Sequence, residues 1–136
     1  AQFSHEAHFT GCVFEKQLWA RKSNFEDFAD FEDCKFNVGS SFRSAKFEMA
    51  SFRSASFEGN SYFAQAKFAR GVFFQDFRST SVVFFNESEF HHHANFNLAA
   101  APVPAGPLYF NGAKFIKSPP LFFWPRDARR YRLDRC

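Results

Sequence analysis

Three adjacent histidines, His91–His93, form the only histidine run in the sequence and are the first residues whose type suggests metal chemistry. Consecutive side chains of an extended segment point to opposite sides, so His91 and His93 can share one ion but His92 cannot join them. With no cysteine or carboxylate obviously joining these two histidines, the sequence does not complete a ligand set. We therefore expect a solvated corner here, and we predict neither a bound metal ion nor any other cofactor.

Acidic residues also cluster, with Asp30, Glu32 and Asp33 close together. A pair of carboxylates can do general acid–base catalysis, but only in a concave site. The sequence has no G-x-S-x-G motif, no glycine-rich phosphate loop and no H-E-x-x-H motif. We predict that the protein is not an enzyme and that it has no catalytic residues.

The C-terminal part holds the strongest candidates for binding. Three aromatic residues suited to cover an open end of the fold, or to dock on a partner, are followed by arginines suited to an anionic surface. The predicted binding residues are Phe122, Phe123, Trp124, Arg126, Arg129, Arg130, Arg132 and Arg135. The net charge is +3, and the last eleven residues account for all of it. Because the rest of the chain is neutral, a broad nucleic-acid footprint is disfavoured.

A repeat organises the elements that must position these residues. The 136-residue chain contains 24 phenylalanines, and most of them follow a small residue by two positions. Successive phenylalanines lie five or six residues apart, and the phase slips by one residue at Phe47, Phe52 and Phe57. The pairs are Ala1/Phe3, Ala7/Phe9, Cys12/Phe14, Ser23/Phe25, Ala29/Phe31, Cys34/Phe36, Ser40/Phe42, Ala45/Phe47, Ala50/Phe52, Ala55/Phe57, Ser61/Phe63, Ala66/Phe68, Ser88/Phe90, Ala94/Phe96 and Ala113/Phe115, with Val72/Phe74 and Val83/Phe85 as larger variants.

This spacing excludes a helix, because residues five or six apart lie on different helix faces. In an extended segment, residues two apart share a face, so each small residue and its phenylalanine can both point inward. The next pair begins three residues later, out of phase, so a corner must intervene. Short walls joined by corners form a coil of roughly 22 residues, and stacked coils form a solenoid. We expect inward rings and polar outward positions.

The run SFRSAKFEMASFRSASFEG (Ser41–Gly59) resembles the pentapeptide-repeat proteins, although that family more often has Leu at the centre of each repeat. The resemblance implies an all-β fold, a right-handed quadrilateral β-helix, here with a short C-terminal cap. It covers residues 1–97, which we predict to be the solenoid. A Pro/Ala-rich excursion at 98–109, a final coil and aromatic cap at 110–125, and a basic tail at 126–136 follow. The tail is compatible with a short helix after Pro125.

Cys12 and Cys34 both stand at the small inward position, about one coil apart. Two interpretations follow: a disulfide between neighbouring coils, or two small buried apolar residues. The second is favoured, since free cysteine commonly serves as a small buried residue.

For function, the resemblance implies a non-catalytic scaffold or protein-interaction module, such as an accessory subunit of a larger assembly. Its partner would dock on a β-face or an open coil end. One alternative is a DNA mimic that binds type II topoisomerases, and another is anionic-surface binding through the arginine-rich tail. No apolar run is long enough for a transmembrane helix, although association with a membrane complex stays open. The compartment also stays open between the cytoplasm and an organelle such as the thylakoid lumen, where family members occur.

Overall fold

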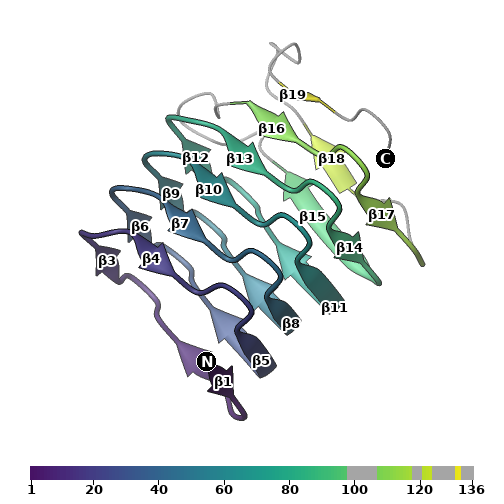
Figure 1. Ribbon diagram of the computed structural model, residues 1–136, viewed down its shortest axis with the longest axis horizontal. Helices are drawn as coiled ribbons and strands as arrows, with labels where there is room; N and C mark the ends of the chain where they lie inside the picture. The colour runs from purple at the N-terminus through teal and green to yellow at the C-terminus, as the bar shows by residue number, and fades with distance from the viewer. Residues whose placement is uncertain (98–106, 118–120, 124–130, 133–136) are drawn as a thin grey trace.

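The computed structural model describes residues 1–97, 107–117, 121–123 and 131–132. In these ranges the chain forms strands, turns and bends but no helix. All the strand pairs are parallel, and the strands stack coil upon coil from the N-terminal end towards the C-terminal end (Figure 1). The predicted all-β solenoid is confirmed, and so is the inward direction of the rings at Phe36, Phe47 and Phe85, which are at most 1% exposed.

The coil has four walls. The first wall holds β1 (Gln2–Phe3), β14 (Glu89–Phe90) and β17 (Lys114–Phe115), and the second holds β2 (Ala7–His8), β15 (His93–Asn97) and β18 (Leu121–Phe123). Three longer strands, β5 (Asn24–Asp30), β8 (Lys46–Ser51) and β11 (Lys67–Phe73), turn the corner and belong to both of these walls. The third wall holds β3 (Val13–Phe14), β6 (Lys35–Phe36), β9 (Ser56–Phe57) and β12 (Arg78–Ser79). The fourth holds β4 (Leu18–Trp19), β7 (Ser40–Ser41), β10 (Ser61–Tyr62), β13 (Val83–Phe84), β16 (Leu108–Tyr109) and β19 (Tyr131–Arg132).

The phase slip in the sequence arises at the corner between the first and second walls, which one coil passes with one residue fewer than its neighbours. Register pairs Phe3 with Phe25 and Phe25 with Phe47, then Phe47 with Phe68. The pairing shifts between Phe25 and Phe28 in β5, and again between Phe68 and Gly71 in β11. β8 passes the same corner with one residue fewer. The coil therefore keeps its ring positions aligned while its length changes by one.

Stacked phenylalanine rings fill the interior. In the second wall, Phe9, Phe31, Phe52, Phe74 and Phe96 stack with centroids 4.8, 5.0, 4.9 and 5.2 Å apart. Rings of adjacent walls meet edge to face. The ring centroids of Phe47 and Phe52, for example, lie 6.0 Å apart, with an angle of 81° between the ring planes. Each favourable ring pair contributes about 0.5–1.5 kcal/mol beyond area burial. The fold is therefore stabilised mainly by one residue type in repeated geometry.

The five-residue corners are tight turns. The backbone N–H of Ala55 donates to the carbonyl of Phe52 (3.1 Å), and Ser54 between them has φ of 56°. Equivalent residues such as Asp33 and Asp76 share this left-handed conformation. Six-residue corners between the third and fourth walls instead bring backbones into contact. A Cβ added to Gly39 would lie 2.6 Å from the carbonyl oxygen of Asn60.

Two positions depart from the repeat. On the fourth wall, Ala20 occupies the central position that a phenylalanine such as Phe42 occupies in the other described coils. Ala20 lines a cavity of about 170 Å³. In β12, Ser79 pairs with Phe57, and Phe77, which directly precedes the strand, lies one step earlier, at the level of Ala55. The ring of Phe77 stays buried and meets Phe57 edge to face at 6.0 Å. Ring and small residue have exchanged positions without emptying the core.

The solenoid continues beyond the proline-rich stretch. β16 pairs with β13, so Leu108 and Tyr109 belong to the fourth wall although they were assigned to the excursion. β18 pairs with β15, and β19 pairs with β16. Because β19 is a strand, the expected helix is wrong at Tyr131 and Arg132. The remaining boundaries stay predictions.

Candidate functional site

The register brings the residue before each central ring into a column on the outside of its wall. On the fourth wall, Trp19 pairs with Ser41, Ser41 with Tyr62, Tyr62 with Phe84, and Phe84 with Tyr109. We call these five residues the outer aromatic column. Four of the five are aromatic, which contradicts the expectation that outward positions are polar.

The rings of the column stack as those of the interior do. The ring centroids of Tyr62 and Phe84 lie 5.1 Å apart, with an angle of 3° between the ring planes. For Phe84 and Tyr109 the centroid distance is 5.5 Å and the interplanar angle is 18°. These three side chains are half-buried, whereas Trp19 is 64% exposed. The fourth wall therefore presents a flat aromatic strip to its surroundings.

Ser41 interrupts the strip. At this rung a small side chain replaces a ring, and a hollow of about 270 Å³ opens, lined by Gln17, Trp19, Arg21, Ser41, Arg43 and Tyr62. Ser41 is only 4% exposed, while both arginines are exposed. In the described part of the chain, no carboxylate lies within ion-pair distance of Arg21 or Arg43. The hollow combines aromatic sides with available positive charge.

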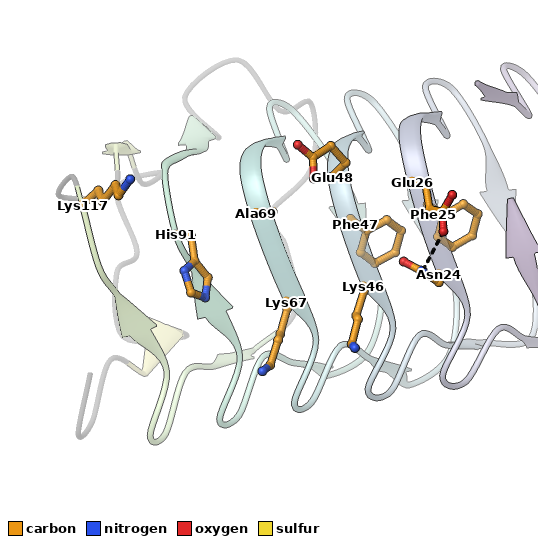
Figure 2. Close-up of a pocket in the computed structure, with 10 residues that line it drawn as sticks. All are labelled: Asn24, Phe25, Glu26, Lys46, Phe47, Glu48, Lys67, Ala69, His91 and Lys117. Carbon is orange, nitrogen blue, oxygen red and sulfur yellow. Dashed lines mark hydrogen bonds between the residues drawn. The ribbon is translucent and has the colours of Figure 1, made fainter. Parts of the chain in front are cut away.

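A second hollow, of about 460 Å³, lies on the outside of the first wall (Figure 2). Lys46 and Lys67 project from neighbouring coils, and Ala69 lies between Glu48 and His91 in the same view. Two of its charges are compensated, because Lys67 Nζ lies 3.6 Å from Glu89 Oε2, and Arg70 Nε lies 2.8 Å from Glu48 Oε1. The surface is polar and mixed in sign.

Glu89 and His91 are coupled on this wall. His91 Nε2 lies 2.9 Å from Glu89 Oε2, and this hydrogen bond, with the nearby positive charges of Lys67 and Lys114, lowers the pKa of Glu89. His91 faces the first-wall hollow, whereas His92 and His93 line a different one, with Met49, Arg70, Gly71 and Phe73. The histidine run is thus divided between two surfaces. Within the residues that the structure covers, no group of three His, Cys, Asp or Glu is arranged to hold a metal ion.

The acidic cluster serves the coil. Thr10 donates to Asp30 (2.8 Å), the backbone N–H of Glu32 donates to the same carboxylate (2.9 Å), and Ser51 donates to Glu32 (2.9 Å). These bonds join neighbouring coils or close a turn. No general acid–base pair is needed to explain them.

Cys12 and Cys34 are aligned on neighbouring coils of the third wall, and both thiols are free. Cys34 is fully buried and donates to the carbonyl of Phe9 (2.8 Å), whereas Cys12 is exposed. Burial raises the pKa of the Cys34 thiol to about 11. The interpretation as a small buried residue therefore holds for Cys34 and is wrong for Cys12.

The structure describes only part of the predicted C-terminal binding set. Phe122 and Phe123 lie in β18, in register with Phe96 and Asn97, and Arg132 lies in β19, in register with Tyr109. Arg132 is thus the next backbone position along the outer aromatic column. The predicted residues Trp124, Arg126, Arg129, Arg130 and Arg135 lie outside the described residues. Their role in binding stays a prediction.

The outer aromatic column was missed at the level of sequence, although a signal was present. Trp19 directly precedes Ala20, and Tyr62, Phe84 and Tyr109 directly precede inward phenylalanines. Their separations of 43, 22 and 25 residues indicate a shared wall only once the coil boundaries are known.

Comparison with known proteins agrees with this architecture. A family model described as pentapeptide repeats (9 copies) matches residues 1–46. No curated protein and no solved structure matches the chain. Among the described residues, no helix has the length and apolar character needed to cross a membrane.

Proposed function

Because residues 1–46 match a family model of pentapeptide repeats and the chain folds as a parallel β-solenoid, we propose that it is a non-catalytic interaction module, an accessory part of a larger assembly, whose protein partner docks on the fourth wall. The observation that carries this proposal is the outer aromatic column, in which Tyr62 stacks on Phe84 on the outside of the fourth wall and both rings are half-buried. Aromatic residues are enriched at protein interfaces and dominate their energetics.

The geometry of the wall supports docking. Parallel strands hold the outward rings at the coil spacing of about 4.8 Å, so little conformational entropy is lost when a partner covers them. A solvated wall needs no aromatic column for folding, since the inward rings already fill the core. Tyr62 and Phe84 form a contiguous apolar surface that the described chain covers only in part, and such surface is typical of interaction sites.

The two alternatives have less support. A DNA mimic needs a uniformly negative surface, but the outer first wall mixes Lys46, Lys67 and Lys114 with Glu48 and Glu89. Binding of anionic surfaces through the arginine-rich tail stays a proposal that a salt titration tests, because such binding weakens steeply with salt.

The experiment compares complexes assembled in the source cells by the tagged wild type and by wall variants. We expect Tyr62→Ser/Phe84→Ser to abolish a stoichiometric complex that the wild type forms. The matched control, Lys35→Ser/Arg78→Ser, changes two exposed residues of the third wall and should retain it. Circular dichroism and thermal melts establish that both variants fold. A complex that survives the fourth-wall variant, or is lost only with the third-wall variant, refutes docking on the fourth wall.

A further inference from the structure

We propose that the hollow at Ser41 receives one aromatic side chain of an acidic peptide segment of the partner, which inserts as the missing rung of the outer aromatic column. This inference rests on the proposed function and names the chemistry that the fourth wall recognises. Its basis is an interrupted stack: rings at Trp19 and Tyr62, a serine between them, and a hollow of about 270 Å³ at that position.

The spacing suits one ring. Trp19 and Tyr62 are two coils apart, about 9.6 Å along the axis at the usual strand separation. Filled rungs of the same column stack at 5.1 and 5.5 Å. A ring placed over Ser41 therefore stacks on both neighbours at the separation that the column already uses. Ser41 provides the floor and has no side-chain bulk to displace.

The charge selects an acidic segment. Arg21 lies in the turn that follows β4, and Arg43 lies in the equivalent turn that follows β7 on the neighbouring coil. Both line the hollow, and no carboxylate of the described chain pairs with either. Carboxylates flanking an inserted ring can therefore form charge-assisted hydrogen bonds with these arginines.

A peptide is a better occupant than a free nucleotide. Beyond the hollow, the column continues through Tyr62 and Phe84, and an extended segment can cover these rings as it leaves the inserted residue. A mononucleotide would offer a ring and an anion but would leave this strip uncovered.

The test uses the probe peptide acetyl-Asp-(para-fluoro-Phe)-Asp-amide, whose fluorine NMR signal reports binding to every variant. We expect saturable binding to the wild type. Ser41→Tyr should weaken it roughly tenfold or more by filling the rung, and Arg21→Gln/Arg43→Gln should weaken it by a similar factor. Ser41→Tyr should fold, because tyrosine already occupies the equivalent positions 62 and 109. Trp19→Ala, which removes an exposed ring, is a second test that folding does not compromise.

Three results of the binding assay overturn the inference: equal binding of the acidic peptide to Ser41→Tyr and wild type, equal binding of acetyl-Lys-(para-fluoro-Phe)-Lys-amide to the wild type, or AMP binding tighter than the acidic peptide. The stoichiometric complex that the tagged protein forms in cells distinguishes failure of the inserted ring from failure of docking on the fourth wall. If Ser41→Tyr keeps the complex while Tyr62→Ser/Phe84→Ser loses it, the wall docks a partner and the inserted ring is refuted. If neither variant affects the complex, docking on the fourth wall fails as well.

Discussion

At the scale of single residues, a phenylalanine ring is useful here only together with the small residue two positions before it. Ala50 and Phe52 are both fully buried, and Phe52 stacks on Phe31 and Phe74 at 5.0 and 4.9 Å. The small side chain leaves the width that the flat ring needs. Where the partner positions exchange, as at Phe77 and Ser79, burial of the ring is retained.

Replacing Phe52 by Asp should remove the cooperative thermal transition. The loss of a buried ring alone costs about 3–5 kcal/mol, and an unpaired charge in the core adds to this cost. Arg53→Asp is the matched control, since Arg53 is adjacent and exposed, and it should change stability by about 0.5 kcal/mol or less. A melt of Phe52→Asp that matches wild type would contradict the register.

The Cys34 thiol should make the protein less stable in alkali. Its folded pKa of about 11 lies above the ordinary value of 9.0, so the unfolded chain ionises first as pH rises. The contribution of the protonated Cys34 thiol to the free energy of unfolding is fully present below about pH 9 and is lost as the pH rises from about 9 to about 11. Urea titrations across this range should show a steeper decline in the unfolding free energy for wild type than for Cys34→Ala. Parallel curves would show that the buried thiol does not titrate as stated.

At the scale of elements, the corners decide how the walls meet. Tight corners tolerate ordinary residues at positive φ, as Asp33, Ser54 and Asp76 demonstrate. Gly39 and Gly59 differ, because each lies against the backbone of a neighbouring coil. Backbone proximity, in addition to φ, therefore requires glycine at the wide corners.

Gly39→Ala should destabilise the protein much more than Gly11→Ala. A Cβ at Gly39 meets the Asn60 carbonyl oxygen at 2.6 Å, whereas a Cβ at Gly11 meets nothing within 4 Å. Gly11→Ala should cost about 1–2 kcal/mol of left-handed strain alone, and Gly39→Ala should add the steric cost. Chemical denaturation of both variants measures the difference, and equal losses would refute the role of backbone contact.

The exchanged pair Phe77 and Ser79 should show strong coupling. Phe77→Ala should cost about 3–5 kcal/mol, and Ser79→Phe about 1–3 through overpacking. Together the two changes restore the usual order of small residue and ring. The double variant should therefore be more stable, by about 0.5–3 kcal/mol, than the sum of the two single-variant losses of unfolding free energy predicts. A double-mutant cycle by urea unfolding measures this energy, and strict additivity would argue against the exchange.

At the scale of the whole molecule, the solenoid is a one-dimensional stack in which each coil contacts its neighbours. The second-wall column runs through Phe31, Phe52, Phe74 and Phe96 without interruption. The outer walls are independent of this core and differ from one another: the first is polar and mixed in charge, and the fourth is aromatic. Recognition is therefore a property of a particular wall.

Energetic coupling should decay along the axis. Phe52→Leu and Phe74→Leu affect stacked rings whose centroids lie 4.9 Å apart. The loss of unfolding free energy in the double variant should therefore differ from the sum of the two single losses by at least about 0.5 kcal/mol. Phe31→Leu and Phe96→Leu are separated by two rungs and should add within about 0.5 kcal/mol. Unfolding free energies of the single and double variants provide the comparison. Equal coupling at both separations would contradict a nearest-neighbour stack.

By itself, the sequence determined the solenoid, the inward rings and the length of the coil, because the pairing of a small residue with a phenylalanine is a local pattern that only short walls and corners accommodate. It also allowed the candidate metal and catalytic clusters to be interpreted as coil residues. The aromatic cap and arginine-rich tail stay predictions apart from the strand positions of Phe122, Phe123 and Arg132.

Only the tertiary structure decided which outward residues share a wall. A coil is 21 residues long at β8 and 22 at its neighbours, and the fourth wall resumes at Leu108 after the proline-rich stretch. Trp19, Ser41, Tyr62, Phe84 and Tyr109 therefore have no constant spacing in the chain. They meet because hydrogen bonding between coils aligns ring positions rather than residue counts, and a column on a surface exists only after that alignment.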